Sequence, residues 1–205
     1  CYAYEQGVTF WDLADMYGSQ PHAGEALKRL PRDRVVILAK TVSREPEKVA
    51  ADVDRFLQVL GTDYLDVLLL HCEMGADWPQ KHAGALEALS RAKGKGLVRA
   101  VGISTHGQDA LAAAAAEPWV DVIMARLNYG GHHMDRPAEE VVAALRRAHA
   151  AGKGTIGMKA LGCGKLAHDP EGAIRYALGT GVLHALTVGM VHREQVEQNV
   201  AVVSG

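Results

Sequence analysis

A regular alternation of short apolar runs with longer helix-like segments constrains the fold more than any other feature of the sequence. The runs are rich in Val, Ile and Leu and nearly continuous in apolar residues. Such continuity is typical of parallel strands that are covered on both faces. We predict strands at Val8–Trp11, Val35–Ala39, Val67–Leu70, Ala100–Ser104, Val120–Arg126, Thr155–Lys159 and Ala185–Val188.

The segments between these runs have helical periodicity. In Pro46–Leu60, Val49, Val53 and Phe56 recur at three- and four-residue spacing, and Gly61 follows as a stop signal. We therefore predict helices at Ala23–Leu30, Pro46–Leu60, Gly84–Lys93, Gln108–Ala116, Ala138–Ala151, Glu171–Thr180 and Glu194–Val203. Strands that alternate with helices form right-handed crossovers and a parallel sheet.

Two architectures satisfy this alternation, an open doubly wound sheet and a closed barrel of eight strands. No Gly-x-Gly-x-x-Gly follows the first strand, which disfavours an open dinucleotide-binding sheet. The opening residues CYAYEQG read as the end of a helix, so an earlier strand is expected to be missing. The prediction is an α/β fold, a parallel (β/α)8 TIM-type barrel without its first strand. Residues 1–205 are predicted to form a single incomplete domain, because no linker or repeat interrupts them.

Composition excludes several classes of partner. The net charge of −2, with Lys and Arg scattered, gives no reason to expect nucleic acid or an anionic membrane surface. Three cysteines at distant positions predict reduced thiols and a cytoplasmic protein, and not a disulfide framework. The loop GGHHMDRP contains adjacent histidines without partner spacing, so no metal is expected. The oligomeric state is not predicted.

Four titratable residues fall at or just after the ends of the first three predicted strands, where barrel enzymes place their active residues. They are Asp12, Tyr17, Lys40 and His71. Taken singly, Asp12 is usually a cap or turn residue, and His71 a hydrogen-bonded rim residue. Lys40 is more unusual, because a lysine that follows VVILA needs a nearby carboxylate, and Asp12 is the candidate.

Together these residues predict a proton-transfer site. A lysine ammonium beside a tyrosine hydroxyl favours the phenolate, so we expect Lys40 to lower the pKa of Tyr17 and to lie within hydrogen-bond reach of it. Asp12 would keep Lys40 charged, and a neutral His71 would orient a carbonyl oxygen. The set contains no nucleophile, so a hydride-carrying cofactor is implied.

These residues also carry a resemblance. GVTFWDLADMYGS, VVILAKT and LDVLLLHC resemble three segments of the aldo/keto reductase family, and the similarity extends from about Gln6 to Ser204. The resemblance assigns the family's catalytic Asp, Tyr, Lys and His to Asp12, Tyr17, Lys40 and His71. Asp15 lies within the same motif, and we interpret it as a solvated loop carboxylate.

The same resemblance implies a nicotinamide cofactor, NADP(H) by family preference with NAD(H) possible. Its expected contacts are Ser104, Thr105, Asn128, Met158, Gly162, Gly164, Gly189, Gln198 and Asn199. Several depart from the family pattern: Thr105 replaces an Asn, Met158 a stacking Tyr, and Gln198 a Glu. Gly189 and Met190 occupy the stretch that usually carries phosphate-selecting basic residues, with only His192 and Arg193 nearby.

The resemblance therefore implies an oxidoreductase that reduces a small-molecule aldehyde or ketone, with Tyr17 as proton donor. A non-catalytic, cofactor-binding regulatory subunit on the same fold is the alternative. A third possibility is that the chain as given is an inactive fragment, because an open barrel leaves two unpaired edges.

Overall fold

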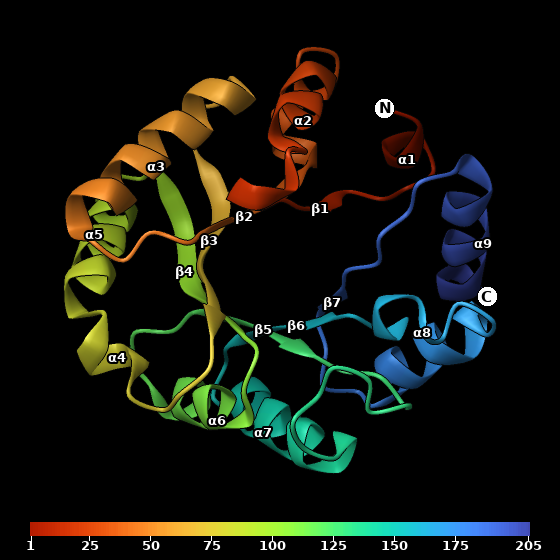
Figure 1. Cartoon of the computed structure of the whole chain (residues 1–205). Helices are drawn as coiled ribbons and strands as arrows, with labels where there is room; N and C mark the ends of the chain where they lie inside the picture. Colours follow the sequence, from red (N-terminus) through yellow and green to blue (C-terminus); the bar gives the residue numbers. More distant parts are fainter.

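The computed structural model describes residues 1–205 and contains a seven-stranded parallel sheet in which neighbouring strands follow chain order. The strands are β1 (Phe10–Asp12), β2 (Val36–Thr41), β3 (Leu65–Glu73), β4 (Val98–Thr105), β5 (Val122–Arg126), β6 (Gly154–Met158) and β7 (Ala185–Leu186). The sheet curves into a nearly closed barrel (Figure 1). The predicted fold, strand order and parallel orientation are confirmed.

Helices form a ring outside this sheet (Figure 1). They are α1 (Tyr2–Glu5), α2 (Gln20–Leu27), α3 (Pro46–Leu60), α4 (Trp78–Lys81), α5 (Ala83–Gly94), α6 (Gln108–Ala116), α7 (Ala138–Ala150), α8 (Pro170–Gly179) and α9 (Arg193–Ser204). The predicted bounds of α3 and α6 are confirmed to the residue, and α4 is an additional helix. No helix is long and apolar enough to cross a membrane.

The two edges of the barrel are its shortest strands, β1 and β7, with three and two residues. They flank the gap, as the sequence predicted. In the outer ring, α1 lies beside α9 at this position (Figure 1). The Tyr2 hydroxyl donates a hydrogen bond to Glu197, and the Arg193 guanidinium lies 4.8 Å from the centre of the Tyr2 ring. The helices therefore contact each other where the strands do not pair.

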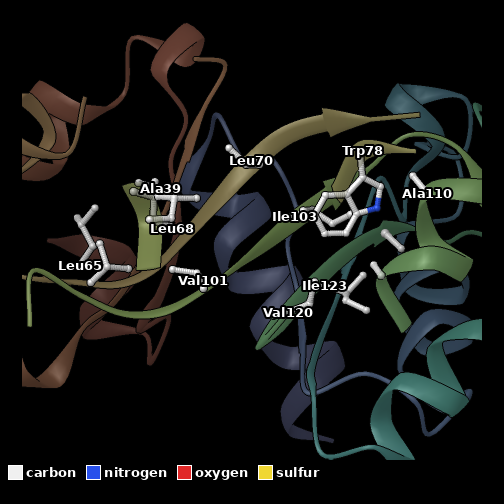
Figure 2. Close-up of a cluster of buried hydrophobic side chains, with 14 of the residues drawn as sticks. Ala39, Leu65, Leu68, Leu70, Trp78, Val101, Ile103, Ala110, Val120 and Ile123 are labelled. Carbon is white, nitrogen blue, oxygen red and sulfur yellow. The ribbon is translucent and has the colours of Figure 1, made fainter. Parts of the chain in front are cut away.

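The core has two layers, because successive side chains of a strand point to opposite faces. A cluster of 34 buried residues fills the space between sheet and helices. Figure 2 shows part of it, with Trp78 of α4 beside Ile103 of β4. A second cluster of seven residues is formed by the opposite faces of the strands and fills the barrel interior: Leu38, Val67, Leu69, Val122, Met124, Ile156 and Met158.

This alternation determines which polar residues face the mouth of the barrel. Leu38 and Leu69 point inward, so Lys40 and His71, two residues further along their strands, point inward as well. The same parity places Asp12 after Phe10 and Arg126 after Met124. The carboxyl ends of the strands thus gather these side chains above the apolar interior, where barrels of this type hold their active sites.

Candidate active site at the barrel mouth

The centre of the mouth is an ion pair between Asp12, at the end of β1, and Lys40 of β2. The Lys40 side chain is fully buried, and the Asp12 side chain is 19% exposed. Burial raises the pKa of Asp12 and lowers the pKa of Lys40, and their mutual attraction offsets both effects in part. The carboxylate therefore provides the partner that a lysine in this position requires.

Tyr17 lies on a short 3-10 turn, Asp15–Tyr17, that follows β1, and it is 52% exposed. The Lys40 ammonium lies 4.8 Å from the centre of the Tyr17 ring, a cation–π contact. No hydrogen bond joins that ammonium to the Tyr17 hydroxyl, contrary to our expectation.

The pKa of Tyr17 is raised to about 12, so the prediction that Lys40 lowers it is wrong. Burial is the largest cause, followed by the negative charge of Asp12 and then Cys72. The main physical reason is that burial disfavours the phenolate; in addition, Asp12 compensates the charge of Lys40 and disfavours a second anion nearby. Tyr17 consequently keeps its proton at neutral pH.

His71 of β3 is 5% exposed, and its ring meets the Tyr17 ring edge-on at 6.0 Å between centres. Burial first, then the positive charges of Lys40 and Arg44, lower the pKa of His71 to about 4. The ring is therefore neutral at pH 7, as the sequence predicted, and its buried Nδ1 has no hydrogen-bond partner. Arg44 donates a 2.6 Å hydrogen bond to the His71 carbonyl and fixes this strand end.

The turn that carries Tyr17 is held by an ion pair that the sequence did not reveal. Arg55 of α3 binds Asp15 at 2.8 Å and Asp52 at 2.6 Å, and Asp52 accepts a 2.5 Å hydrogen bond from the Thr41 hydroxyl. The interpretation of Asp15 as a solvated carboxylate is wrong, because it anchors the turn to α3. The sequence feature that could have indicated these ion pairs is Asp52, a carboxylate on the buried face of that helix.

The end of β3 is irregular. Its register with β4 shifts between Leu70 and Glu73, and Cys72 adopts a φ of 68°, which is uncommon for a residue with a side chain. The Cys72 N–H donates a 2.9 Å hydrogen bond to the Ser104 hydroxyl. This geometry brings the Cys72 Sγ to 3.5 Å from Nε2 of His106, a residue just beyond β4.

The expected cofactor residues on β4 and after β5 are committed to contacts within the protein. Ser104 is buried and accepts from Cys72, while the Thr105 hydroxyl lies 3.4 Å from the Met124 carbonyl. The Asn128 amide donates to the carbonyls of His132 and Lys159, and its oxygen accepts from the His132 N–H. Asn128 therefore closes the loop after β5.

The expected cofactor contacts at the end of β6 and in the loop after it differ in accessibility. Met158 is 7% exposed and belongs to the apolar barrel interior. A side chain at Gly162 would lie 2.9 Å from the His132 Cβ, so close packing requires this glycine. Gly164, with a φ of 94°, has open space around it, which leaves its backbone accessible.

The remaining expected contacts lie between β7 and the end of the chain. Gly189 is exposed, with open space where a side chain would be. Gln198 is exposed on α9, and Asn199 beside it is partly buried. A single groove that joins them to Ser104 stays a prediction.

Two cations lie at the mouth, of which Lys159 was expected at a strand end and Arg126 was given no role. Arg126 ends β5, and Lys159 follows β6 with a φ of 59°. Neither has a carboxylate within ion-pairing distance. Burial first, then Arg126 and Lys159, lower the pKa of His106 to about 4. The sequence did contain a signal for Arg126, because it lies two residues after Met124 and therefore points to the same face of the strand.

Comparison with known proteins places this arrangement among relatives. The sequence model of the Aldo/keto reductase family matches residues 1–172. A D-threo-aldose 1-dehydrogenase from Pseudomonas sp. is 26% identical over 211 residues, which cover 86% of this chain and 63% of the relative. A NAD/NADP-dependent indole-3-acetaldehyde reductase from Schizosaccharomyces pombe is 35% identical over 107 residues, which cover 50% of this chain and 37% of the relative. The chain thus spans less than two thirds of either relative.

A solved structure shares the fold. An aldo-keto reductase from Bacillus halodurans aligns with all of this chain and 80% of its own, with a TM-score of 0.81 and 21% identity.

Proposed function

The chain belongs to the aldo/keto reductase family, and from this premise we propose that it reduces an aldehyde or ketone to the alcohol with a nicotinamide cofactor. The observation that carries the proposal is the convergence of four side chains at one barrel mouth. Asp12 pairs with Lys40, Lys40 lies over the Tyr17 ring, and His71 meets that ring edge-on.

Each of the four groups has a role that follows from its protonation. A neutral His71 donates a hydrogen bond to the carbonyl oxygen and orients the substrate. Tyr17, whose pKa is about 12, holds the proton that the oxygen takes as its negative charge develops. Lys40 stabilises the phenolate left behind, and Asp12 keeps the buried ammonium compensated.

The donor set lacks only a hydride source, and the residues present fit a nicotinamide dinucleotide in this role. The cofactor supplies a hydride to the carbonyl carbon when bound. The Ser104 hydroxyl accepts from the Cys72 N–H but keeps its own hydrogen, which it would donate to the nicotinamide, and the accessible backbone at Gly164 and Gly189 would accommodate the phosphates. Gln198 and Asn199 would contact its adenosine. Asn128 would act indirectly, by holding the loop that contains Gly131 and His132.

The name of the fission-yeast relative includes both NAD and NADP, which supports a site that accepts either cofactor. The Pseudomonas relative is named as an aldose dehydrogenase, so it acts in the oxidative direction on a sugar. In the present chain the raised pKa of Tyr17 keeps the phenol protonated at neutral pH, which is the state that carbonyl reduction requires.

The test is carbonyl-dependent oxidation of NADPH or NADH across a panel of aldehydes and ketones. Tyr17→Phe should lower turnover about 100- to 10,000-fold, the usual contribution of a positioned proton donor, with cofactor Kd nearly unchanged. Tyr129→Phe is the matched control, because Tyr129 is an exposed tyrosine whose hydroxyl bonds Asp169. Normal turnover in Tyr17→Phe under conditions where chemistry limits the rate contradicts Tyr17 as the proton donor, whereas cofactor binding without any turnover in the parent protein favours a non-catalytic, cofactor-binding subunit.

A further inference from the structure

Three metal-ligand side chains meet beside the tetrad. One ligand atom from each of His71, Cys72 and His106 lies within 4.8 Å of the other two, and the Cys72 Sγ lies 3.5 Å from Nε2 of His106. The His71 and His106 rings meet edge-on at 6.2 Å between centres. A cluster of two imidazoles and a thiol is the donor set that zinc prefers in proteins.

The backbone at the end of β3 creates this cluster. Consecutive residues of a regular strand point to opposite faces, so His71 and Cys72 would normally diverge. The register shift and the φ of 68° at Cys72 turn its thiol toward the mouth, where the Ser104 hydroxyl holds its N–H. A strained conformation at a non-glycine residue marks a functional constraint more often than chance.

His71 supplies a second observation. The residue is only 5% exposed, and its Nδ1 is buried without a hydrogen-bond partner. An unpaired buried polar atom costs free energy and calls for an explanation, and an absent ligand at the adjacent site is one.

We infer that His71, Cys72 and His106 form a binding site for a zinc-class divalent cation, with the fourth coordination position open to the mouth. Zinc bonds of about 2.0–2.3 Å in a tetrahedron place neighbouring ligand atoms about 3.5 Å apart. The Cys72 Sγ and the His106 Nε2 already have that separation. The His71 ligand atom, within 4.8 Å of both, would reach it by a movement of the side chain.

Charge balance sets the character of the site. Binding breaks the Cys72 S–H bond, forms a metal–thiolate bond and releases one proton to solvent, so the two-plus ion adds one net charge. Arg126 and Lys159 stand nearby without carboxylate partners and oppose that charge. Burial raises the pKa of the Cys72 thiol, and the two cations offset that rise only in part. The site is therefore exchangeable, unlike a closed structural zinc site.

The effect of metal binding on the reaction rests on the proposed function. His71 is the group that orients the carbonyl oxygen, so a cation bound to it withdraws that group from the substrate. Zinc binding should therefore inhibit the reductase reversibly, and a chelator should restore it.

Cobalt(II) binding tests the site without any use of activity. The starting protein carries Cys1→Ser and Cys163→Ser, which remove the two exposed thiols and leave Cys72. Titration with Co²⁺ should give one equivalent of a thiolate-to-metal charge-transfer band, and excess Zn²⁺ should abolish it. Cys72→Ser should eliminate the band, and His106→Gln should weaken affinity by at least about 10- to 100-fold, the cost of losing even a partner of a ligand.

The outcomes separate the site from the reaction. An absent band in the starting protein overturns the site. The site is also overturned if Cys72→Ser and His106→Gln bind Co²⁺ as tightly as the starting protein does, when circular dichroism shows both variants folded. Zinc should inhibit the starting protein at a lower concentration than it inhibits His106→Gln, each measured against its own metal-free rate. Inhibition at the same concentration overturns the regulatory role and leaves the site. A Co²⁺ band in a protein without metal-free reductase activity supports the site and contradicts the proposed function alone.

Discussion

The two sides of the barrel mouth are held together by different interactions. At the ends of β1–β3, charged side chains contact one another: Asp12 pairs with Lys40, and Arg44 with Glu73 at 2.7 Å. At the ends of β4–β6, polar side chains contact backbone instead: Ser104 accepts from Cys72, and Asn128 closes its loop. The first side is held by charge compensation and the second by hydrogen bonds to the chain.

This difference fits the resemblance seen in the sequence, which is full at the four expected catalytic residues and departs at the expected cofactor contacts. A buried ammonium requires a carboxylate, so Lys40 and Asp12 are tied to each other by their desolvation cost. Glycine backbone and loop contacts impose no such pairing, so Thr105 and Met158 can stand where other members have Asn and Tyr. The side that contains the Asp12–Lys40 pair is therefore the more constrained of the two.

The largest expected effect tests that constraint directly. Lys40→Met leaves Asp12 without its partner, and breaking a buried pair from one side typically costs about 3–5 kcal/mol. The free energy of unfolding, from urea denaturation, should fall by this amount. Combining Asp12→Asn with Lys40→Met should restore most of it. If Lys40→Met alone is as stable as the parent protein, the ion pair does not compensate the cost of burying these two charges.

A smaller loss is expected on the other side. Asn128→Ala removes two hydrogen bonds to His132 in the loop after β5 and one to the Lys159 carbonyl after β6, and the backbone groups it leaves cost about 1–3 kcal/mol. Thr105→Val is the matched control, because its hydroxyl makes a long 3.4 Å contact whose loss should cost under about 1 kcal/mol. If Asn128→Ala is as stable as Thr105→Val, the loop is held by other contacts and Asn128 is free for the cofactor.

The smallest effect concerns the choice of cofactor. Gly189 has no side chain, His192 caps the start of α9, and Arg193 lies over the Tyr2 ring. No cation is therefore fixed for a 2′-phosphate, and the Kd values for NADPH and NADH should differ by less than about tenfold. Quenching of protein fluorescence by each cofactor measures both. A hundredfold preference for NADPH, about 2.7 kcal/mol, would show that Arg193 leaves Tyr2 and binds the phosphate.

Periodicity in the sequence predicted what depends on local pattern. The bounds of Pro46–Leu60 and Gln108–Ala116, the strand order and the meeting of Asp12 with Lys40 all followed from spacing and burial. Lys40 and His71 were expected at strand ends and lie within strands, because the ladder continues into the polar mouth. The four-residue helix at Trp78–Lys81 was too short for any periodicity to show.

The remainder depends on contacts between residues far apart in the chain. No local pattern joins Asp15 to Arg55 or Cys72 to His106, since each pair meets only after the barrel forms. The direction of the Tyr17 pKa shift was missed for a related reason. Sequence spacing placed Lys40 beside the tyrosine, but the direction of the shift depends first on the burial of the phenol, and then on the charge of Asp12 and on which atoms the ammonium contacts.

We propose that Tyr17 holds its proton until the carbonyl oxygen takes it. Single-turnover rates, measured in both directions from pH 6 to pH 10, test this most directly. A pKa of about 12 keeps the phenol protonated over this whole range, so the reduction rate should be flat. Alcohol oxidation needs the phenolate and should rise about tenfold per pH unit. A reduction rate that falls with a midpoint near pH 8, together with an oxidation rate that levels off there, would show that Lys40 lowers the pKa of the phenol and would contradict the account.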